Sequence, residues 1–78
     1  MTKVWFSKNL EYLRKAYKLS QDDLGKLVGK THTAIYKWEN GLAEPSLKHI
    51  GFLAEYFKVP VDVLIFDDIT QTEFAVSR

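Results

Sequence analysis

Four polar side chains lie at helical spacing near the middle of this chain: His32, Thr33, Tyr36 and Lys37. Separations of three and four residues link them into one face of a helix. On such a face a lysine can donate to guanine O6 and N7, a threonine can offer its hydroxyl or pack its methyl group on thymine, and a histidine can donate or accept. This set of side chains suits hydrogen bonding to base edges. The alternative is that they are ordinary solvated side chains on an amphipathic helix.

A helix between Thr31 and Asn40 must position these side chains. Thr31 has the side chain of an N-cap residue, and Asn40 followed by Gly41 is typical of a helix end. Ile35 and Trp38 then fall on the other side of the helix and are predicted to be buried. The four polar residues are therefore predicted to face solvent.

A second short helix is predicted immediately before this one. Ser20 and Asp23 stand three residues apart, as in a capping box with aspartate in place of the usual glutamate. Gly29 can take the left-handed conformation that ends a helix. The residues predicted to face inward are Leu24, Leu27 and Val28. Because only Gly29 and Lys30 separate the two helices, they must cross steeply, which is the geometry of a helix-turn-helix.

Three further helices are predicted around this unit. Ser7 is placed to cap a first helix that runs to about Lys18, and Pro45 lies at or just before the first turn of a fourth. Their apolar positions recur every three or four residues: Leu10, Leu13, Ala16 and Tyr17 in the first, and Leu47, Ile50, Leu53, Ala54 and Phe57 in the fourth. A short fifth helix over about residues 61–65 brings Leu64 onto the core. We therefore expect an all-α fold, a compact bundle of about five short helices.

The C-terminal stretch gives weaker signals. Residues 1–66 are predicted to form one domain with its helix-turn-helix at about residues 19–41, and residues 67–78 a tail or dimerisation segment. An alternative is a short terminal β-pairing between residues 72–76 and residues 3–6, because both segments alternate loosely between apolar and polar side chains.

Residues 19–41 closely resemble the helix-turn-helix of the phage-repressor/Cro-type family, with the sequence LSQDDLGKLVGKTHTAIYKWENG. The resemblance continues through Pro45, Leu53 and Val59 and covers about residues 10–66. It implies a lambda-repressor-like fold and sequence-specific binding to double-stranded DNA. One departure is Gly25, which stands where the family usually has alanine and should make its helix less stable by about 1 kcal/mol.

The resemblance also implies roles for residues that flank the recognition helix. Gln21 resembles the family glutamine that holds a DNA phosphate and often braces the recognition helix, and Asn40 resembles a second phosphate contact. Arg14 and Glu39 resemble a structural ion pair between the first helix and the end of the third, which is worth only about 0–1 kcal/mol if it is exposed. Lys30, in the turn, is a predicted phosphate contact.

The base-reading positions of the family fall on the polar face described above. The resemblance assigns base contacts to His32, Thr33 and Lys37, and Tyr36 lies beside them, where it can touch a base or a phosphate.

Charge and composition narrow the classes of function. Residues 1–41 hold eight basic and four acidic side chains, a net charge of +4, whereas residues 42–78 have a net charge of −3. A basic first half suits a phosphate-binding surface. Without cysteine, and with only His32 and His49 as histidines, the sequence predicts no metal site and no cofactor. No apolar run approaches the ~18 residues of a membrane helix, and we expect a cytoplasmic protein.

Together these features predict a transcriptional regulator of phage or bacterial type, a repressor that binds a pseudo-palindromic operator as a homodimer. The fourth and fifth helices or the tail are the predicted dimer surface. The alternatives are a protein-interaction module, such as an antitoxin-like partner, and the DNA-binding fragment of a longer regulator. An enzyme is not expected, because 78 residues with this pattern leave little room for a polar pocket.

Overall fold

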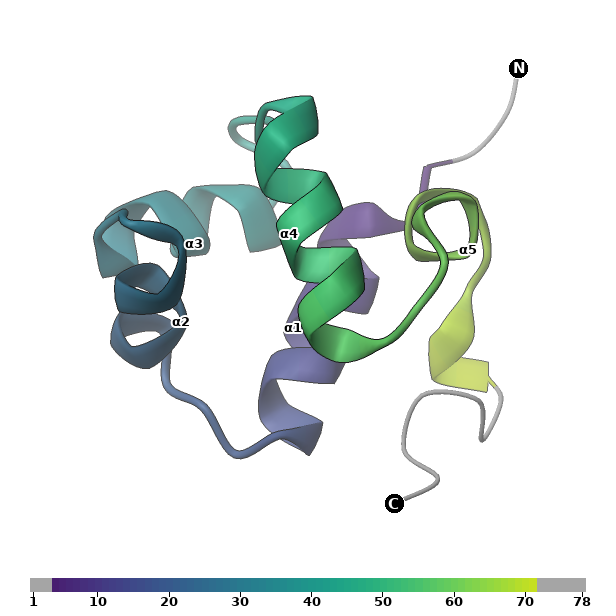
Figure 1. The fold of residues 1–78 in the computed structure, drawn as a ribbon, viewed down its shortest axis with the longest axis horizontal. Coiled ribbons are helices and arrows are strands. Elements are labelled where there is room, and N and C mark those ends of the chain that lie inside the picture. The colour runs from purple at the N-terminus through teal and green to yellow at the C-terminus, as the bar shows by residue number, and fades with distance from the viewer. Residues whose placement is uncertain (1–3, 72–78) are drawn as a thin grey trace.

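The computed structural model of this 78-residue chain describes residues 4–71. Within that range the fold is all-helical, as predicted, with helices α1 (Phe6–Ala16), α2 (Gln21–Val28), α3 (His32–Glu39), α4 (Leu47–Phe57) and α5 (Val61–Phe66), followed by a 3₁₀ turn at Ile69–Gln71. Helices α2 and α3 form one end of the molecule, and α5 with the 3₁₀ turn forms the other (Figure 1). The predicted β-pairing joins residues 72–76 to residues 3–6. Residues 72–76 and residue 3 lie outside the described residues, and Phe6 is the first residue of α1.

A single apolar core joins these helices. Every helix contributes to it, and its buried apolar side chains are Phe6, Leu10, Leu13, Leu24, Ile35, Trp38, Leu53, Ala54, Phe57, Val59, Leu64 and Ile69. Ile35, Trp38 and Leu64 are buried as predicted, so the buried side of α3 is assigned correctly. That assignment fixes which side of α3 is left to solvent.

Three residues predicted on an inward apolar stripe are exposed. Leu27 retains 41% of its accessible surface and Leu47 retains 77%. Ala16 is exposed as well, at the last residue of α1. Leu47 is the first residue of α4, where the helix extends past the core. The helical period gives the direction of the stripe, but the width that is covered depends on the neighbouring helices.

The local signals at the ends of α2 act as predicted. The Ser20 hydroxyl accepts from the Asp23 amide at 2.9 Å, and the Asp23 carboxylate accepts from the Ser20 amide at 2.9 Å, which completes the capping box. Gly29 ends α2 in the left-handed conformation, with φ of 74°. Thr31 is the N-cap residue of α3 by position, but its side chain makes no capping hydrogen bond.

The predicted cap of the first helix is wrong. Trp5, not Ser7, precedes α1, and α1 ends at Ala16 rather than near Lys18. The Ser7 hydroxyl instead donates to the backbone carbonyl of Trp38 at 2.6 Å. This contact ties the start of α1 to the third helix, and nothing local in the sequence distinguishes it from a cap.

The segment after α5 folds back onto α1 around a buried asparagine. The amide nitrogen of Asn9 donates to the carbonyls of Leu64, at 2.8 Å, and Asp67, at 2.6 Å, and its oxygen accepts from the Ile69 amide at 3.3 Å. Ile69 is only 2% exposed. The domain boundary at residue 66 remains a prediction, and the first residues beyond it pack against the helical core.

Candidate nucleic-acid interface

The turn between α2 and α3 packs tightly against α2. The amide of Lys30 donates to the carbonyl of Gly25 at 2.8 Å. A side chain at Gly25 would place its Cβ 2.9 Å from the Lys30 carbonyl oxygen and 2.9 Å from the carbonyl carbon of Thr31. The absence of a side chain at Gly25 therefore lets the backbone of the turn approach α2 and sets how α3 crosses it.

The outer face of α3 carries the four predicted base-reading residues. His32, Thr33 and Lys37 are exposed, and Tyr36 retains 50% of its surface. Across residues 4–71, none of these four side chains is engaged in a hydrogen bond or an ion pair. Their polar groups are therefore available to an external partner, while Ile35 on the opposite side anchors the helix.

Trp38 anchors the last turn of α3. Its side chain is 4% exposed, and its ring lies 5.4 Å from the ring of His49 on α4, centroid to centroid. Its backbone carbonyl accepts the Ser7 hydroxyl described above. The side of α3 opposite the polar face is thus held by α1 and α4, and these contacts set the direction in which the polar face points.

A buried ion pair joins α1 to the end of α3. Arg14 Nε lies 2.6 Å from Glu39 Oε2, and Arg14 Nη2 lies 3.2 Å from Glu39 Oε1. The two side chains are 10% and 2% exposed. The pair is therefore not the exposed ion pair to which the estimate of 0–1 kcal/mol applies, and losing one partner would leave the other charge buried.

The three predicted phosphate contacts lie at the two ends of α3 and the start of α2. Gln21 is the first residue of α2, and its Nε2 donates to Glu39 Oε1 at 3.1 Å. Lys30 is exposed in the turn. Asn40 is exposed at the C-terminal end of α3, where its amide nitrogen donates to the Tyr36 carbonyl at 2.8 Å.

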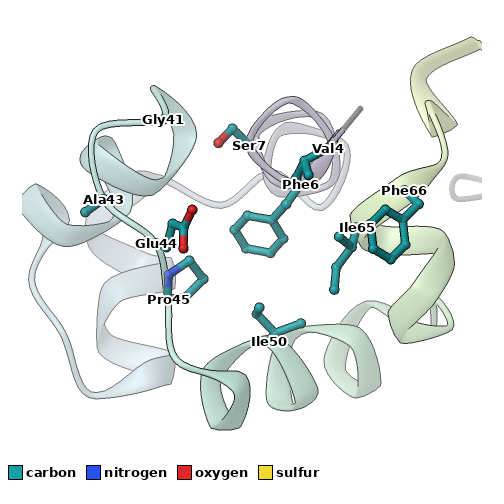
Figure 2. A pocket seen from close by; sticks show the side chains of 10 residues that line it. All are labelled: Val4, Phe6, Ser7, Gly41, Ala43, Glu44, Pro45, Ile50, Ile65 and Phe66. Atoms are coloured by element: carbon teal, nitrogen blue, oxygen red, sulfur yellow. The ribbon is translucent and has the colours of Figure 1, made fainter. Parts of the chain in front are cut away.

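An apolar groove that the sequence did not predict lies away from the polar face of α3. It encloses about 430 Å³ between the start of α1, the α3–α4 loop, α4 and the end of α5 (Figure 2). The residues that line it are Val4, Phe6, Ser7, Gly41, Ala43, Glu44, Pro45, Ile50, Ile65 and Phe66. Glu44 is the one charged side chain among them, and none of the predicted base or phosphate contacts belongs to the lining. The groove and the polar face of α3 can therefore be occupied together.

Among residues 4–71, histidines and carboxylates gather nowhere in a group of three that could hold a metal ion. None of the helices found there has the length and apolar character that crossing a membrane requires.

Helices α2 and α3, joined by the tight turn at Gly29 and Lys30 and with a polar face of α3 free for contacts, define a helix-turn-helix domain. The family model described as helix-turn-helix matches residues 10–64, and the chain belongs to this Cro/C1-type helix-turn-helix family.

Three curated relatives are similar to this chain in sequence. The Repressor protein C2 of Salmonella phage P22 is 36% identical over 62 residues, which cover 80% of this chain and 29% of that protein. The HTH-type transcriptional activator BcrR of Enterococcus faecalis is 32% identical over 60 residues, with 77% and 29% covered. An HTH-type transcriptional regulator of Methanocaldococcus jannaschii is 37% identical over 60 residues, with 76% and 91% covered. The chain thus spans less than a third of the length of the first two relatives.

A solved structure shares the fold. The P22 c2 repressor in complex with a synthetic operator superposes with a TM-score of 0.74 at 30% identity, covering 81% of this chain and 96% of that chain. This likeness agrees with the predicted lambda-repressor-like bundle.

Proposed function

We propose that this chain is the sequence-specific, double-stranded DNA-binding domain of a transcriptional regulator. The observation that carries the proposal is the outer face of α3, where His32, Thr33, Tyr36 and Lys37 have polar groups without partners inside the described fold. The family membership and the regulator names of the relatives support it.

In this proposal α3 enters the major groove from its N-terminal end. Lys37 donates to guanine O6 and N7, Thr33 contacts a thymine methyl group or a base edge, and His32 bonds a base at the start of the helix. Tyr36 lies beside them and touches a base or a phosphate. Loss of one such side chain changes the preferred base at one position.

Phosphate contacts flank these base contacts. Lys30 and Gln21 hold the DNA backbone on either side of the N-terminal end of α3, and Asn40 holds it at the C-terminal end of α3. A lysine that neutralises a phosphate releases about one counterion, so it affects every DNA sequence alike.

We further propose that the domain binds DNA as a homodimer whose two copies meet over the apolar groove. Phe66, 46% exposed, and Val4, 61% exposed, extend the apolar surface at one side of the groove. Two-fold pairing presents the two α3 helices to successive major grooves about 34 Å apart, so the operator half-sites are palindromic.

The dimer surface is tested by sedimentation over a range of concentrations. Phe66→Asp places a charge at the groove and is expected to weaken self-association. Phe52→Asp is the matched control, because Phe52 is 40% exposed and two residues from Ile50, so it points to roughly the opposite side of α4. Equal effects of the two changes would count against the groove as the interface.

Repression is the proposed outcome of binding, because occupation of an operator blocks other proteins without any additional surface. The P22 relative is named a repressor and BcrR an activator, so a reporter assay with the operator upstream of a promoter is the decisive test. A rise in reporter output on expression of the chain would reverse this assignment. The proposed setting is the cytoplasm of a bacterium or of a phage-infected cell, where the operator DNA is, and the proposed domain binds without catalysing a reaction.

A protein-interaction module is the second candidate, and the same groove favours it. In that case a different protein, such as a toxin held by its antitoxin, covers the groove, and the net charge of −3 in residues 42–78 suits a basic partner. A tight complex without any salt-sensitive DNA binding would support this candidate over the first.

DNA binding itself is tested by fluorescence anisotropy on duplexes at several salt concentrations. Lys30→Ala is expected to weaken binding to all sequences and to reduce the salt slope by about one unit. Lys8→Ala removes the same charge at a site beside Asp68, 3.8 Å away, and is expected to leave the slope unchanged. Equal slopes for Lys30→Ala and the unmodified chain would remove Lys30 from the interface.

A further inference from the structure

We infer that Glu39 is a positioning residue for DNA binding, which turns the side-chain amide of Gln21 so that one of its N–H groups faces a phosphate. The inference rests on the proposed function and concerns how the Gln21 contact is made. The inference is drawn from three hydrogen-bonded side chains. Arg14 and Gln21 both donate hydrogen bonds to the carboxylate of Glu39.

The carboxylate of Glu39 fixes the direction of the Gln21 amide. A carboxylate only accepts hydrogen bonds, so the amide must present its nitrogen to Glu39 and its oxygen elsewhere. The Nε2 atom of Gln21 lies 3.1 Å from Glu39 Oε1, so one of the two N–H bonds of the amide is directed at Glu39. Among the hydrogen bonds of residues 4–71, none engages the second N–H.

That second N–H is the group a phosphate requires. Phosphate oxygens accept hydrogen bonds, and a freely rotating glutamine presents its own acceptor oxygen to them as readily as its donor. Gln21 is half-buried at the first position of α2, so its amide is in reach of solvent. Holding the amide in one orientation removes the unproductive arrangement before DNA arrives.

Arg14 allows the Glu39 carboxylate to orient the Gln21 amide even though the ligand, a phosphate, is also an anion. An unpaired carboxylate next to a phosphate would repel it, but two hydrogen bonds from Arg14 neutralise Glu39, at 2.6 and 3.2 Å. Arg14 Nη1 also donates to the Leu19 carbonyl at 2.8 Å, directly before the Ser20 cap. The same arginine thus fixes where α2 begins and where Gln21 stands.

A double-mutant cycle on DNA affinity separates positioning from simple structural support. The proteins are the unmodified chain, Gln21→Ala, Glu39→Gln and the double variant, at a temperature where circular dichroism shows all four folded. The probe is the duplex that the unmodified chain enriches most from a random pool. Gln71→Ala, which removes an exposed amide from the 3₁₀ turn, is the matched control and is expected to bind like the unmodified chain.

Gln21→Ala is expected to weaken binding about tenfold, because it removes one hydrogen bond to a charged group. Glu39→Gln is expected to weaken binding about twofold, because an amide that is no longer held presents its oxygen to the phosphate as readily as its donor. The double variant is expected to bind no more weakly than Gln21→Ala alone. The salt slope should stay the same in Gln21→Ala as in the unmodified chain, because a neutral amide releases no counterion. If Glu39→Gln weakens binding as much in the Gln21→Ala background as in the unmodified chain, Glu39 does not act through Gln21 and the inference is overturned.

Proton NMR of the Gln21 amide in the unmodified chain gives a readout that needs no variant to fold. The proton bonded to Glu39 is expected to keep its chemical shift when the duplex is added, while the other proton shifts. Equal movement of both protons, or of neither, overturns the inference. Failure of the unmodified chain to bind any duplex overturns the proposed function itself and this inference with it, whereas binding with independent effects overturns the inference alone.

Discussion

The backbone of Lys30 lies so close to Gly25 that the interhelical turn occupies the space where a side chain would begin. An added Cβ at Gly25 would stand 2.9 Å from the Lys30 carbonyl oxygen. The obstacle is backbone rather than the flexible end of a side chain, so it cannot move aside without moving the start of α3. The placement of α3 therefore depends on the presence of glycine at this position of α2.

We predict that Gly25→Ala fails to give the stabilisation that helix propensity alone would bring, about 1 kcal/mol. Gly51→Ala is the matched control, because Gly51 is also inside a helix and, apart from its chain neighbours and the backbone of its own helix, no atom lies within 4 Å of its Cβ position. Gly51→Ala should raise the free energy of unfolding by about 0.5–1 kcal/mol, and Gly25→Ala should leave it unchanged or lower it. Urea denaturation measures both, and equal gains would show that the turn yields freely.

The Arg14–Glu39 pair predicts a large loss on removal of the arginine. Arg14→Met leaves the Glu39 carboxylate buried without its partner, which should lower the free energy of unfolding by about 3–5 kcal/mol. Lys15→Met breaks the neighbouring but exposed Lys15–Glu11 pair, 3.0 Å long, and should cost about 0.5 kcal/mol or less. Urea denaturation measures both losses in the free energy of unfolding. Equal losses for the two variants would contradict the burial of the Arg14–Glu39 pair.

The capping box of α2 predicts a dependence of stability on pH. Hydrogen bonds from the backbone amide and the hydroxyl of Ser20 hold the pKa of Asp23 below its ordinary value. A carboxyl whose pKa is lowered by folding stabilises the fold above its unfolded pKa, near 3.9, and that contribution is lost as the pH falls through the lower folded value.

The stability advantage of the unmodified chain over Asp23→Ala should therefore be greatest at neutral pH and shrink below about pH 4. Thermal unfolding as a function of pH measures it. Asp22→Ala, which keeps the capping box and removes an exposed ion pair with Lys26, serves as the control. An advantage that stays constant down to the lowest pH would show that the carboxylate takes no part in the cap.

Asn9 predicts that the segment after α5 unfolds together with the core. Asn9→Ala removes the hydrogen bonds to the carbonyls of Leu64 and Asp67 and from the amide of Ile69, and loss of a buried hydrogen bond of this kind costs about 1–3 kcal/mol. Hydrogen exchange at the Ile69 amide should be slow in the unmodified chain and much faster in Asn9→Ala. Rapid exchange in both would mean that residues 67–71 are not held to α1.

The helices and the polar face of α3 were predictable because their signals are local. Ser20 and Asp23 cap α2 through neighbouring atoms, Gly29 ends it through its own backbone, and the positions of Ile35 and Trp38 fix the buried side of α3. Such features need only residues within one or two turns of each other.

The remaining features depend on contacts between distant residues. Ser7 has the side chain of a cap but bonds to Trp38, 31 positions away, and Leu47 fits an apolar stripe but has nothing to cover it. Asn9 had one detectable signal, since it stands three residues after Phe6 on the inward face of α1, where a polar residue implies buried partners. The apolar groove had no detectable signal in the sequence, because it forms where four separate segments meet.

Selection of bound sequences from a random duplex pool, at one defined salt concentration, tests the central claim most directly. The unmodified chain is predicted to enrich a two-fold motif with half-sites about one helical turn apart, and Lys37→Ala is predicted to lose the preference at one position in each half-site. Thr33→Ala should relax a different position. The claim is contradicted if the unmodified chain enriches no motif, or if Lys37→Ala and Thr33→Ala both enrich the same motif as the unmodified chain.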